Sequence, residues 1–246
     1  MKRSRKILAG CLAGTGAALA GVSLQFARQA KKMDDPPIPV PDQGKIRIAC
    51  IGDSITYGAG VMFYGREKKV WTAKLGELLG GEYQVLNYGI SGATLQDEGD
   101  KPYKTFKQLD KAKEAQPAVC ILMLGTNDSK PYNWDADRYK EQLALWIEDL
   151  KGACPDCKIV LITPPYTCPA RGKKVVAFDI LNETIRDEIR PIVMEAAAAN
   201  GLPLIDLYTC TDGRSDWLAD GVHPNAEGNK QIAAYICREL EAQHVI

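Results

Sequence analysis

Short apolar segments alternate with longer segments of helical periodicity from residue 46 to the end of the chain. The apolar segments are predicted strands, at residues 46–51, 83–88, 118–124, 158–163 and 202–207. The predicted helices cover residues 70–79, 105–115, 135–151, 175–200 and 224–243. The third strand is apolar at every position, as expected for a strand that is covered on both faces. The alternation therefore predicts βαβ units and a single three-layer α/β/α domain around a largely parallel sheet.

The start of the chain has a different composition. Four basic residues lie within the first six positions, and residues 7–24 carry no charge. Ala18 and Ala20 provide the small residues of a signal-peptide cleavage site, and the uncharged run is also about as long as a short membrane span, roughly 18 residues. We therefore predict that residues 1–24 are a secretory signal peptide or an N-terminal membrane anchor.

The next segment, residues 25–45, contains four prolines and charges of both signs. This composition is typical of an extended linker, so we expect the folded domain to cover residues 46–246. Export would place that domain outside the cytoplasm, either secreted or held at a membrane only through the N-terminal segment.

The charge balance excludes one class of partner. The chain has 31 Lys+Arg and 31 Asp+Glu, and removal of the first twenty residues leaves 27 basic against 31 acidic residues. Nucleic-acid-binding domains usually carry a strongly basic face. We therefore expect no nucleic-acid partner.

Four segments are rich in small and polar residues; three of them lie at the ends of predicted strands, and the fourth lies beyond the fifth strand. In open parallel sheets, ligands bind beyond the carboxyl ends of the strands. The four segments read GDSITYG at 52–58, NYGISGA at 87–93, GTND at 125–128 and DGVHP at 220–224. Side chains and N–H groups useful in acyl transfer are therefore expected at one edge of the sheet.

Hydrolysis of an ester by a serine needs a base that takes the hydroxyl proton. The chain has two histidines, and one lies in the last three residues, so His223 is the candidate base for Ser54. Asp220 is three positions earlier and can orient the imidazole. The N–H groups of Ser54 and Gly92 and the side-chain amide of Asn127 are candidate donors to an oxyanion.

Each of these residues also has a simpler structural interpretation. Ser54 or Asp220 can cap a helix, and Asn127 can hold a turn. We interpret Asp53 and Asp128 as residues that fix loops rather than as acid–base groups. A flavodoxin-like site for a phosphate or FMN, or a glycan-binding module without activity, are alternative functions, but the first loop lacks the Gly-x-x-x-x-Gly-Lys pattern.

The blocks GDSIT, ISGA, GTND and DGVHPN resemble the signature blocks of the SGNH hydrolase (GDSL esterase/lipase) superfamily. The resemblance extends from residue 46 to about residue 240. It implies a flavodoxin-like α/β/α sandwich with five parallel strands in the order 2-1-3-4-5. It also implies Ser54 as nucleophile, Gly92 and Asn127 as oxyanion donors with the Ser54 N–H, and His223 with Asp220 as the rest of the triad. An esterase of this kind needs neither a metal nor a cofactor.

Aromatic residues gather in the loops near the expected site. Aromatic faces stack on sugar rings, although such residues also pack over helix ends. The residues concerned are Tyr57, Tyr64, Tyr132, Trp134, Tyr166 and Trp217. The stretch GTNDSKPYNW also resembles carbohydrate-acting members, including sialate and xylan O-acetylesterases. We therefore predict a serine esterase that hydrolyses acetyl esters on carbohydrates; the alternative is a lysophospholipase or thioesterase of the same superfamily.

The chain contains eight cysteines, and export would expose them to oxidation. Cys154 and Cys157 have CxxC spacing, which is typical of a disulfide-bonded turn, a redox motif or half of a zinc site. Cys168 and Cys210 follow neighbouring strands and are a second candidate pair.

Overall fold

The structure is a computed structural model, and it describes residues 33, 35–63 and 65–246. The predictions for residues 1–24 and for Tyr64 lie outside this described part. The chain divides at Pro37 into two units, and every described strand belongs to the second unit, Ile38–Ile246. No helix among the described residues combines the length and the apolar composition needed to span a membrane.

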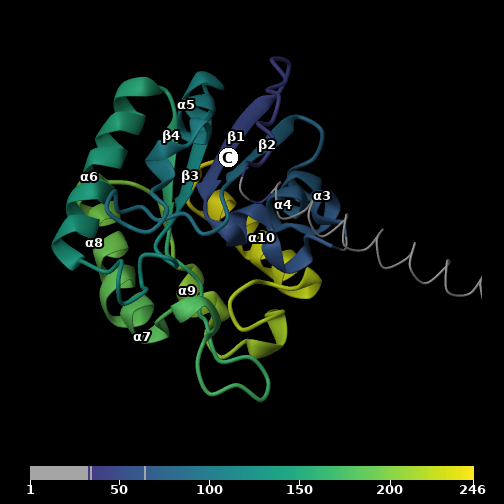
Figure 1. The fold of residues 1–246 in the computed structure, drawn as a ribbon. Helices are drawn as coiled ribbons and strands as arrows, with labels where there is room; N and C mark the ends of the chain where they lie inside the picture. The colour runs from purple at the N-terminus through teal and green to yellow at the C-terminus, as the bar shows by residue number, and fades with distance from the viewer. Residues whose placement is uncertain (1–32, 34, 64) are drawn as a thin grey trace, which may run out of the picture. The chain divides into compact units, whose positions relative to one another are not determined.

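The second unit contains a parallel sheet of five strands in the order β2-β1-β3-β4-β5, which confirms the predicted fold and strand order (Figure 1). The strands are β1 (Ile46–Gly52), β2 (Tyr83–Gly89), β3 (Val119–Met123), β4 (Lys158–Ile162) and β5 (Leu204–Ile205). Gly52 of β1 is in register with Gly89 of β2 and with Met123 of β3. These three neighbouring strands therefore end at the same level, and the loops that follow them start side by side.

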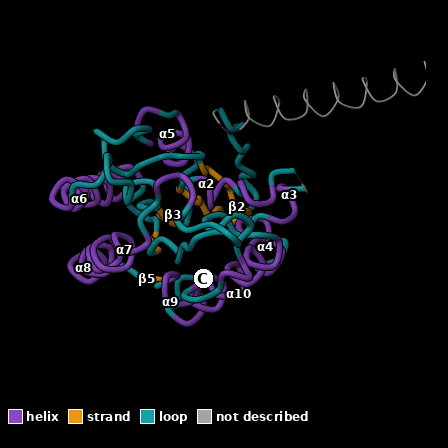
Figure 2. Tube along the Cα trace, turned by 60° about the horizontal axis from the view of Figure 1, so that its bottom comes forward, coloured by secondary structure: helices purple, strands orange, loops and turns teal. Residues whose placement is uncertain are grey.

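Helices cover both faces of the sheet, as Figure 2 shows. The longer helices are α4 (Trp71–Leu79), α5 (Lys107–Glu114), α6 (Ala136–Ala153), α8 (Arg190–Asn200) and α10 (Ala226–Ala242). Helices α4 and α10 pack on the face that carries Ile48 and Cys50, and the other three pack on the face that carries Ala49 and Ile51. Alternate residues of β1 thus enter two separate cores, which explains why the strands are apolar at successive positions.

Short helical turns complete the described part of the chain. They are α2 (Ser54–Tyr57), α3 (Arg66–Lys69), α7 (Asn182–Thr184), α9 (Leu207–Thr211), the π-helical η4 (Ile185–Ile189) and the 3-10 turns η1 (Ala59–Val61), η2 (Tyr103–Thr105), η3 (Ala177–Asp179) and η5 (Ser215–Trp217). Most of them lie in loops at the carboxyl ends of the strands, where the candidate residues were predicted.

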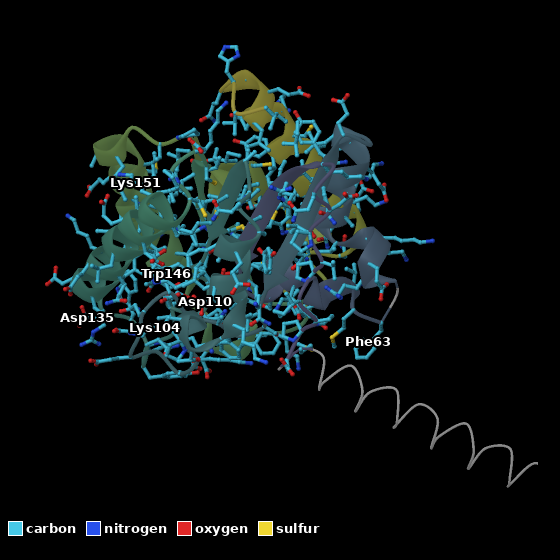
Figure 3. All side chains as sticks on the ribbon, turned by 90° about the horizontal axis from the view of Figure 1, so that it is seen from above. Phe63, Lys104, Asp110, Asp135, Trp146 and Lys151 are labelled. Atoms are coloured by element: carbon cyan, nitrogen blue, oxygen red, sulfur yellow. The ribbon has the colours of Figure 1, made fainter. Side chains whose placement is uncertain are left out.

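Helix α6 illustrates how local sequence and packing agree. The Asp135 carboxylate accepts a hydrogen bond from the N–H of Arg138 at 3.0 Å and so caps the first turn (Figure 3). The apolar residues at helical spacing, among them Leu143, Trp146 and Ile147, are buried against the sheet. Each such side chain contributes roughly 1.5–3 kcal/mol through burial, so packing rather than propensity stabilises this helix.

Two element predictions were wrong in extent. The helix expected at 175–200 begins only at Asn182, because Phe178 and Asp179 have positive φ angles of 63° and 58° that a helix cannot contain. The strand expected at 202–207 is reduced to two residues of the edge strand β5, because the chain turns into α9 at Leu207. In both regions the backbone departs from the regular element that the sequence pattern predicts.

All seven cysteines in the described part are free thiols, so neither candidate disulfide is formed. The Cys154 thiol contacts the carbonyl oxygen of Lys113 at 3.5 Å, and the Cys157 thiol contacts that of Lys158 at 3.7 Å. The two sulfur atoms of the CxxC turn therefore have separate partners. Among the described residues, no group of three or more His, Cys, Asp or Glu side chains is arranged to hold a metal ion.

Candidate active site

Ser54 lies in the first turn of α2, directly beyond the end of the central strand β1. The Asp53 carboxylate accepts a hydrogen bond from the N–H of Ile55 at 2.8 Å and so caps this short helix. Burial raises the pKa of Asp53 to about 6, although hydrogen bonds from Ile55 and Thr126 oppose that effect. Asp53 therefore fixes the turn that presents Ser54, which is the role the sequence predicted for it.

Ser54, His223 and Asp220 form a continuous chain of hydrogen bonds. The His223 Nε2 atom lies 2.8 Å from the Ser54 Oγ atom, across 169 positions of sequence. The His223 Nδ1 atom lies 2.7 Å from the Asp220 Oδ2 atom. The other oxygen of Asp220 accepts the N–H groups of Val222 and His223, at 3.0 and 2.8 Å. The ring is thus oriented by the carboxylate on one side and directed at the hydroxyl on the other.

The Asp220 carboxylate is held in its charged form. Burial opposes ionisation, but the hydrogen bond and the charge of His223, together with the two backbone N–H donors, lower the pKa of Asp220 to about 2. An ionised carboxylate at this position fixes the proton of the imidazole on Nδ1 and leaves Nε2 free to accept a proton from Ser54.

The predicted oxyanion donors lie in the loops that follow β1, β2 and β3. Gly92 has a φ angle of 79°, a conformation that side chains other than glycine rarely adopt. The Asn127 side chain donates one N–H to the carbonyl oxygen of Ala93 at 3.1 Å, which leaves its second N–H for another acceptor. Within the described part of the chain, no residue accepts a hydrogen bond from the backbone N–H of Ser54 or of Gly92.

A buried network joins the loops that carry these donors. The Asp128 carboxylate accepts the N–H groups of Leu95 and Gln96, at 3.0 and 2.9 Å. Asn133 donates to the carbonyl oxygen of Asn127 at 2.9 Å and accepts the Gln96 side-chain amide through its own carbonyl, also at 2.9 Å. Asp128 therefore ties the loop after β2 to the loop after β3, which agrees with its predicted role.

Burial raises the pKa of Asp128 to about 6, against the effect of its backbone donors. Gln96 and Asn133 were not predicted from the sequence, because neither belongs to a catalytic residue type. The available signal was their closeness to the motif blocks, since Gln96 is three positions after Ala93 of ISGA and Asn133 is five positions after Asp128 of GTND.

A close approach of backbone segments explains one glycine of the site. A Cβ atom on Gly89 at the end of β2 would lie 2.2 Å from the backbone nitrogen of Tyr57 in α2. The turn that carries Ser54 can therefore lie on β2 only if this residue has no side chain.

The aromatic residues predicted for substrate binding separate into two groups. Tyr57 is buried beneath the Arg66 guanidinium, 4.4 Å from the ring centroid, and Trp217 is buried beneath Arg214 at 4.0 Å. These two rings pack against their own fold, which corrects their prediction as substrate contacts.

Trp134 is half-buried against Tyr139, with its indole N–H donated to Glu188 at 2.8 Å. Tyr132 is 61% exposed, and Tyr166 lines a cavity. A role in substrate binding therefore stays a prediction for Trp134, Tyr132 and Tyr166.

The structure places another aromatic ring beside His223. The Phe178 ring lies edge-on to the imidazole, with 5.3 Å between the ring centroids. Phe178 is 57% exposed and belongs to the segment that the sequence placed inside a helix. The sequence pattern predicted a helix at this segment, so nothing in the sequence indicated that Phe178 lies beside His223.

The chain matches the GDSL-like Lipase/Acylhydrolase family over residues 50–231. It is 35% identical over 227 residues to an acetylxylan esterase from Xylanibacter ruminicola, with 83% of this chain and 45% of that protein covered. The chain thus spans less than half the length of that relative.

Two solved structures are similar to the fold. A lipase/acylhydrolase from Enterococcus faecalis is 25% identical with a TM-score of 0.63, covering 80% of this chain and 96% of the other. A carbohydrate acetylesterase from Sinorhizobium meliloti is 20% identical with a TM-score of 0.61, covering 81% and 100%.

Proposed function

Since the chain belongs to the GDSL-like lipase/acylhydrolase family, we propose that it is a serine esterase that removes acetyl groups from carbohydrates. The observation that carries the proposal is the unbroken hydrogen-bond chain from Ser54 through His223 to Asp220. A serine hydroxyl that donates to an oriented, neutral imidazole is the activated nucleophile of acyl transfer.

In the first half of the reaction, His223 Nε2 takes the proton of Ser54 as the Oγ atom attacks the acetyl carbonyl carbon. The carbonyl oxygen becomes an oxyanion and is bound by the N–H groups of Ser54 and Gly92 and by the free N–H of Asn127. Donors held in place before the reaction stabilise this charge without reorganisation. The network of Asp128, Asn133 and Gln96 provides that rigidity.

Collapse of the tetrahedral intermediate breaks the bond between the carbonyl carbon and the alcohol oxygen. The proton on His223 Nε2 passes to that oxygen, and the free alcohol leaves an acetyl-enzyme on Ser54. In the second half, His223 takes a proton from a water molecule that attacks the acetyl-enzyme. The same proton then returns to Ser54 Oγ as acetate is released, so the enzyme regains its starting state.

The acetyl and carbohydrate parts of the proposal draw on the relatives. The acetylxylan esterase from Xylanibacter ruminicola is named for acetyl groups on a polysaccharide, and this chain shares 35% of its residues over the aligned region. The alternative is a short-chain lysophospholipase or thioesterase of the same superfamily, which would prefer a longer acyl group than acetyl. Comparison of nitrophenyl acetate with nitrophenyl octanoate separates the two, since the proposal requires a preference for acetate.

We also propose that the protein is exported, because basic residues and an uncharged run precede the prolines of residues 25–45. Fractionation of cells that express the full chain tests this proposal. Recovery of the protein only from the cytoplasm would contradict it.

The test of the proposed function is acetate release from acetylated xylan, pectin, peptidoglycan and sialic acids by the wild type and by Ser54→Ala. We expect release from at least one carbohydrate by the wild type and none by the variant. Ser215→Ala is the matched control, because Ser215 is an exposed serine outside the hydrogen-bond chain. Undiminished acetate release by Ser54→Ala would refute the mechanism.

A further inference from the structure

A cavity of about 500 Å³ is formed mainly by the part of the chain that follows β4. Its walls come from the segment that follows β4 and from the segment before and within α7. Residues that line it include Tyr166, Thr167, Lys174, Val176, Leu181 and Glu183. In Figure 1 the green loop between β4 and α7 extends beyond the sheet on the side where the strands end.

Two contacts join this cavity to the hydrogen-bond chain of the active site. The N–H of Cys168, a lining residue, donates to the carbonyl oxygen of Gly221 at 2.9 Å, two positions before His223. Phe178 stands in sequence between Val176 and Asp179, which both line the cavity. Its ring is edge-on to the His223 ring. One wall of the cavity therefore contacts the loop that carries His223.

The chemistry of acyl transfer decides which part of a substrate lies on that side. The histidine returns its proton to the leaving alcohol oxygen, so the alcohol must lie beside Nε2 of His223. The proposed donors Gly92 and Asn127 follow β2 and β3, whereas the cavity is formed mainly by residues that follow β4. A cavity whose wall contacts the His223 loop thus lies on the side of the alcohol part of the ester.

The size of the cavity also favours the alcohol part. An acetyl group has three non-hydrogen atoms, which fill roughly 100 Å³ if each takes the volume of a water molecule. The observed volume is several times larger and falls within the range of about 300–1,000 Å³ that is typical of ligand sites. The cavity is therefore built for something much larger than the acyl group of an acetate.

The walls combine groups that suit a sugar. Thr167, Lys174 and Glu183 offer hydrogen-bonding groups of different kinds, and Tyr166 offers an aromatic ring. Val175 lines the cavity and is 75% exposed, and the nearby Phe178 is 57% exposed. A pyranose ring has both hydroxyl groups and an apolar C–H face, so it matches polar walls with aromatic and apolar neighbours.

From these observations we infer that the cavity binds the sugar chain that carries the acetyl group, and that Phe178 at its junction with His223 determines specificity for that chain. The inference rests on the proposed function, and it assigns a binding site to the alcohol part of the ester substrate. The positive φ angles of Phe178 and Asp179 are uncommon for such residues, and strained residues of this kind occur at ligand sites.

The test compares the wild type with Phe178→Gly on acetylated xylo-oligosaccharides of increasing length and on nitrophenyl acetate. The readout is the ratio of kcat/KM on the oligosaccharide to kcat/KM on the small ester. We expect this ratio to fall by about tenfold or more, mainly through KM, as the loss of one stacking ring implies. The gain in kcat/KM with oligosaccharide length should also be lost.

Glycine is well suited to this position, because the positive φ of 63° is strained for phenylalanine and relaxed for glycine. The melting temperature of Phe178→Gly is therefore a check that the variant is folded. Leu145→Ala is the matched control, since Leu145 is 54% exposed on the solvent side of α6, and it should leave the ratio unchanged.

Three outcomes separate the inference from the function on which it rests. A wild type that hydrolyses nitrophenyl acetate but no acetylated carbohydrate would refute the proposed function. Deacetylation of oligosaccharides with an unchanged ratio in Phe178→Gly would overturn the inference and leave the function standing. A selective loss of nitrophenyl octanoate hydrolysis in the variant would mean that the cavity binds the acyl chain, and would also overturn the inference.

Discussion

The most demanding test of the oxyanion site is the replacement of Asn127 by alanine. Asn127 is buried, and one N–H of its amide is held by the carbonyl oxygen of Ala93 at 3.1 Å. This bond fixes the orientation of the amide before a substrate binds. The change to alanine removes the second N–H and leaves the Ser54 and Gly92 donors in place.

The expected loss is that of one donor out of three. Removal of one preorganised donor lowers kcat by about 10²–10³, or roughly 2.7–4 kcal/mol in the activation free energy. KM should change little, because the donor acts on charge that develops only in the transition state. The lost hydrogen bond to Ala93 should cost about 1 kcal/mol of unfolding free energy, which lowers Tm by roughly 2–4 °C for a domain of this size.

The assay is steady-state hydrolysis of nitrophenyl acetate, with urea unfolding of the same preparations. Asn200→Ala is the matched control, since Asn200 at the end of α8 donates to Ala196 at 3.0 Å and accepts from Lys151 at 2.7 Å. It should cost a similar unfolding free energy and leave kcat unchanged. If Asn127→Ala is folded and keeps kcat within about threefold of the wild type, the assignment of this donor is wrong.

Three further changes test the surroundings of the site. Gly92→Ala places alanine at a φ of 79° with its Cβ 3.5 Å from Lys101 Cδ, so backbone strain alone should cost about 1–2 kcal/mol in urea unfolding, and an unchanged stability would contradict this. Asp220→Asn should lower kcat by about 100-fold or more, because the imidazole loses its charged partner. The Asp220 pKa of about 2 lies below the unfolded value of 3.8, so its carboxylate stabilises the fold above about pH 4, and this contribution is lost as the pH falls through 2. Since the Asp220 side chain is 38% exposed, we expect the free energies of unfolding of wild type and variant to differ by on the order of 1 kcal/mol at pH 6. This difference should shrink towards pH 2, and a difference that does not vary with pH would refute the contribution of the carboxylate. Asn229→Ala removes the side-chain oxygen that accepts the buried backbone N–H of Trp71 at 2.8 Å, and the amide that donates to the carbonyl oxygens of Pro224 and Asn225. The free energy of unfolding in urea should fall by about 2–3 kcal/mol. A decrease below about 1 kcal/mol would argue against a stabilising role for Asn229.

The pattern of the sequence determined the architecture and the order of its parts. Strand β3 is apolar at every position because the two faces of the sheet enter separate cores, and this property is local to the strand. The residues Ser54, Gly92 and Asn127 were predictable as neighbours because parallel strands that end in register bring the loops after them together. The contacts by which Asp53 and Asp135 cap their helices are also local, since each carboxylate reaches an N–H two or three positions ahead.

Only the tertiary structure decided how distant segments meet. The 2.8 Å contact between His223 and Ser54 joins residues 169 positions apart, and no local pattern sets such a distance. The segment at 175–181 has apolar residues at helical spacing, yet Phe178 and Asp179 have positive φ angles, and the Phe178 ring lies against His223. Periodicity predicts which face of a segment is apolar, whereas the segment that packs on that face depends on the whole domain. The residues of the triad were therefore predictable from their motifs, but the position of Phe178 beside His223 was not.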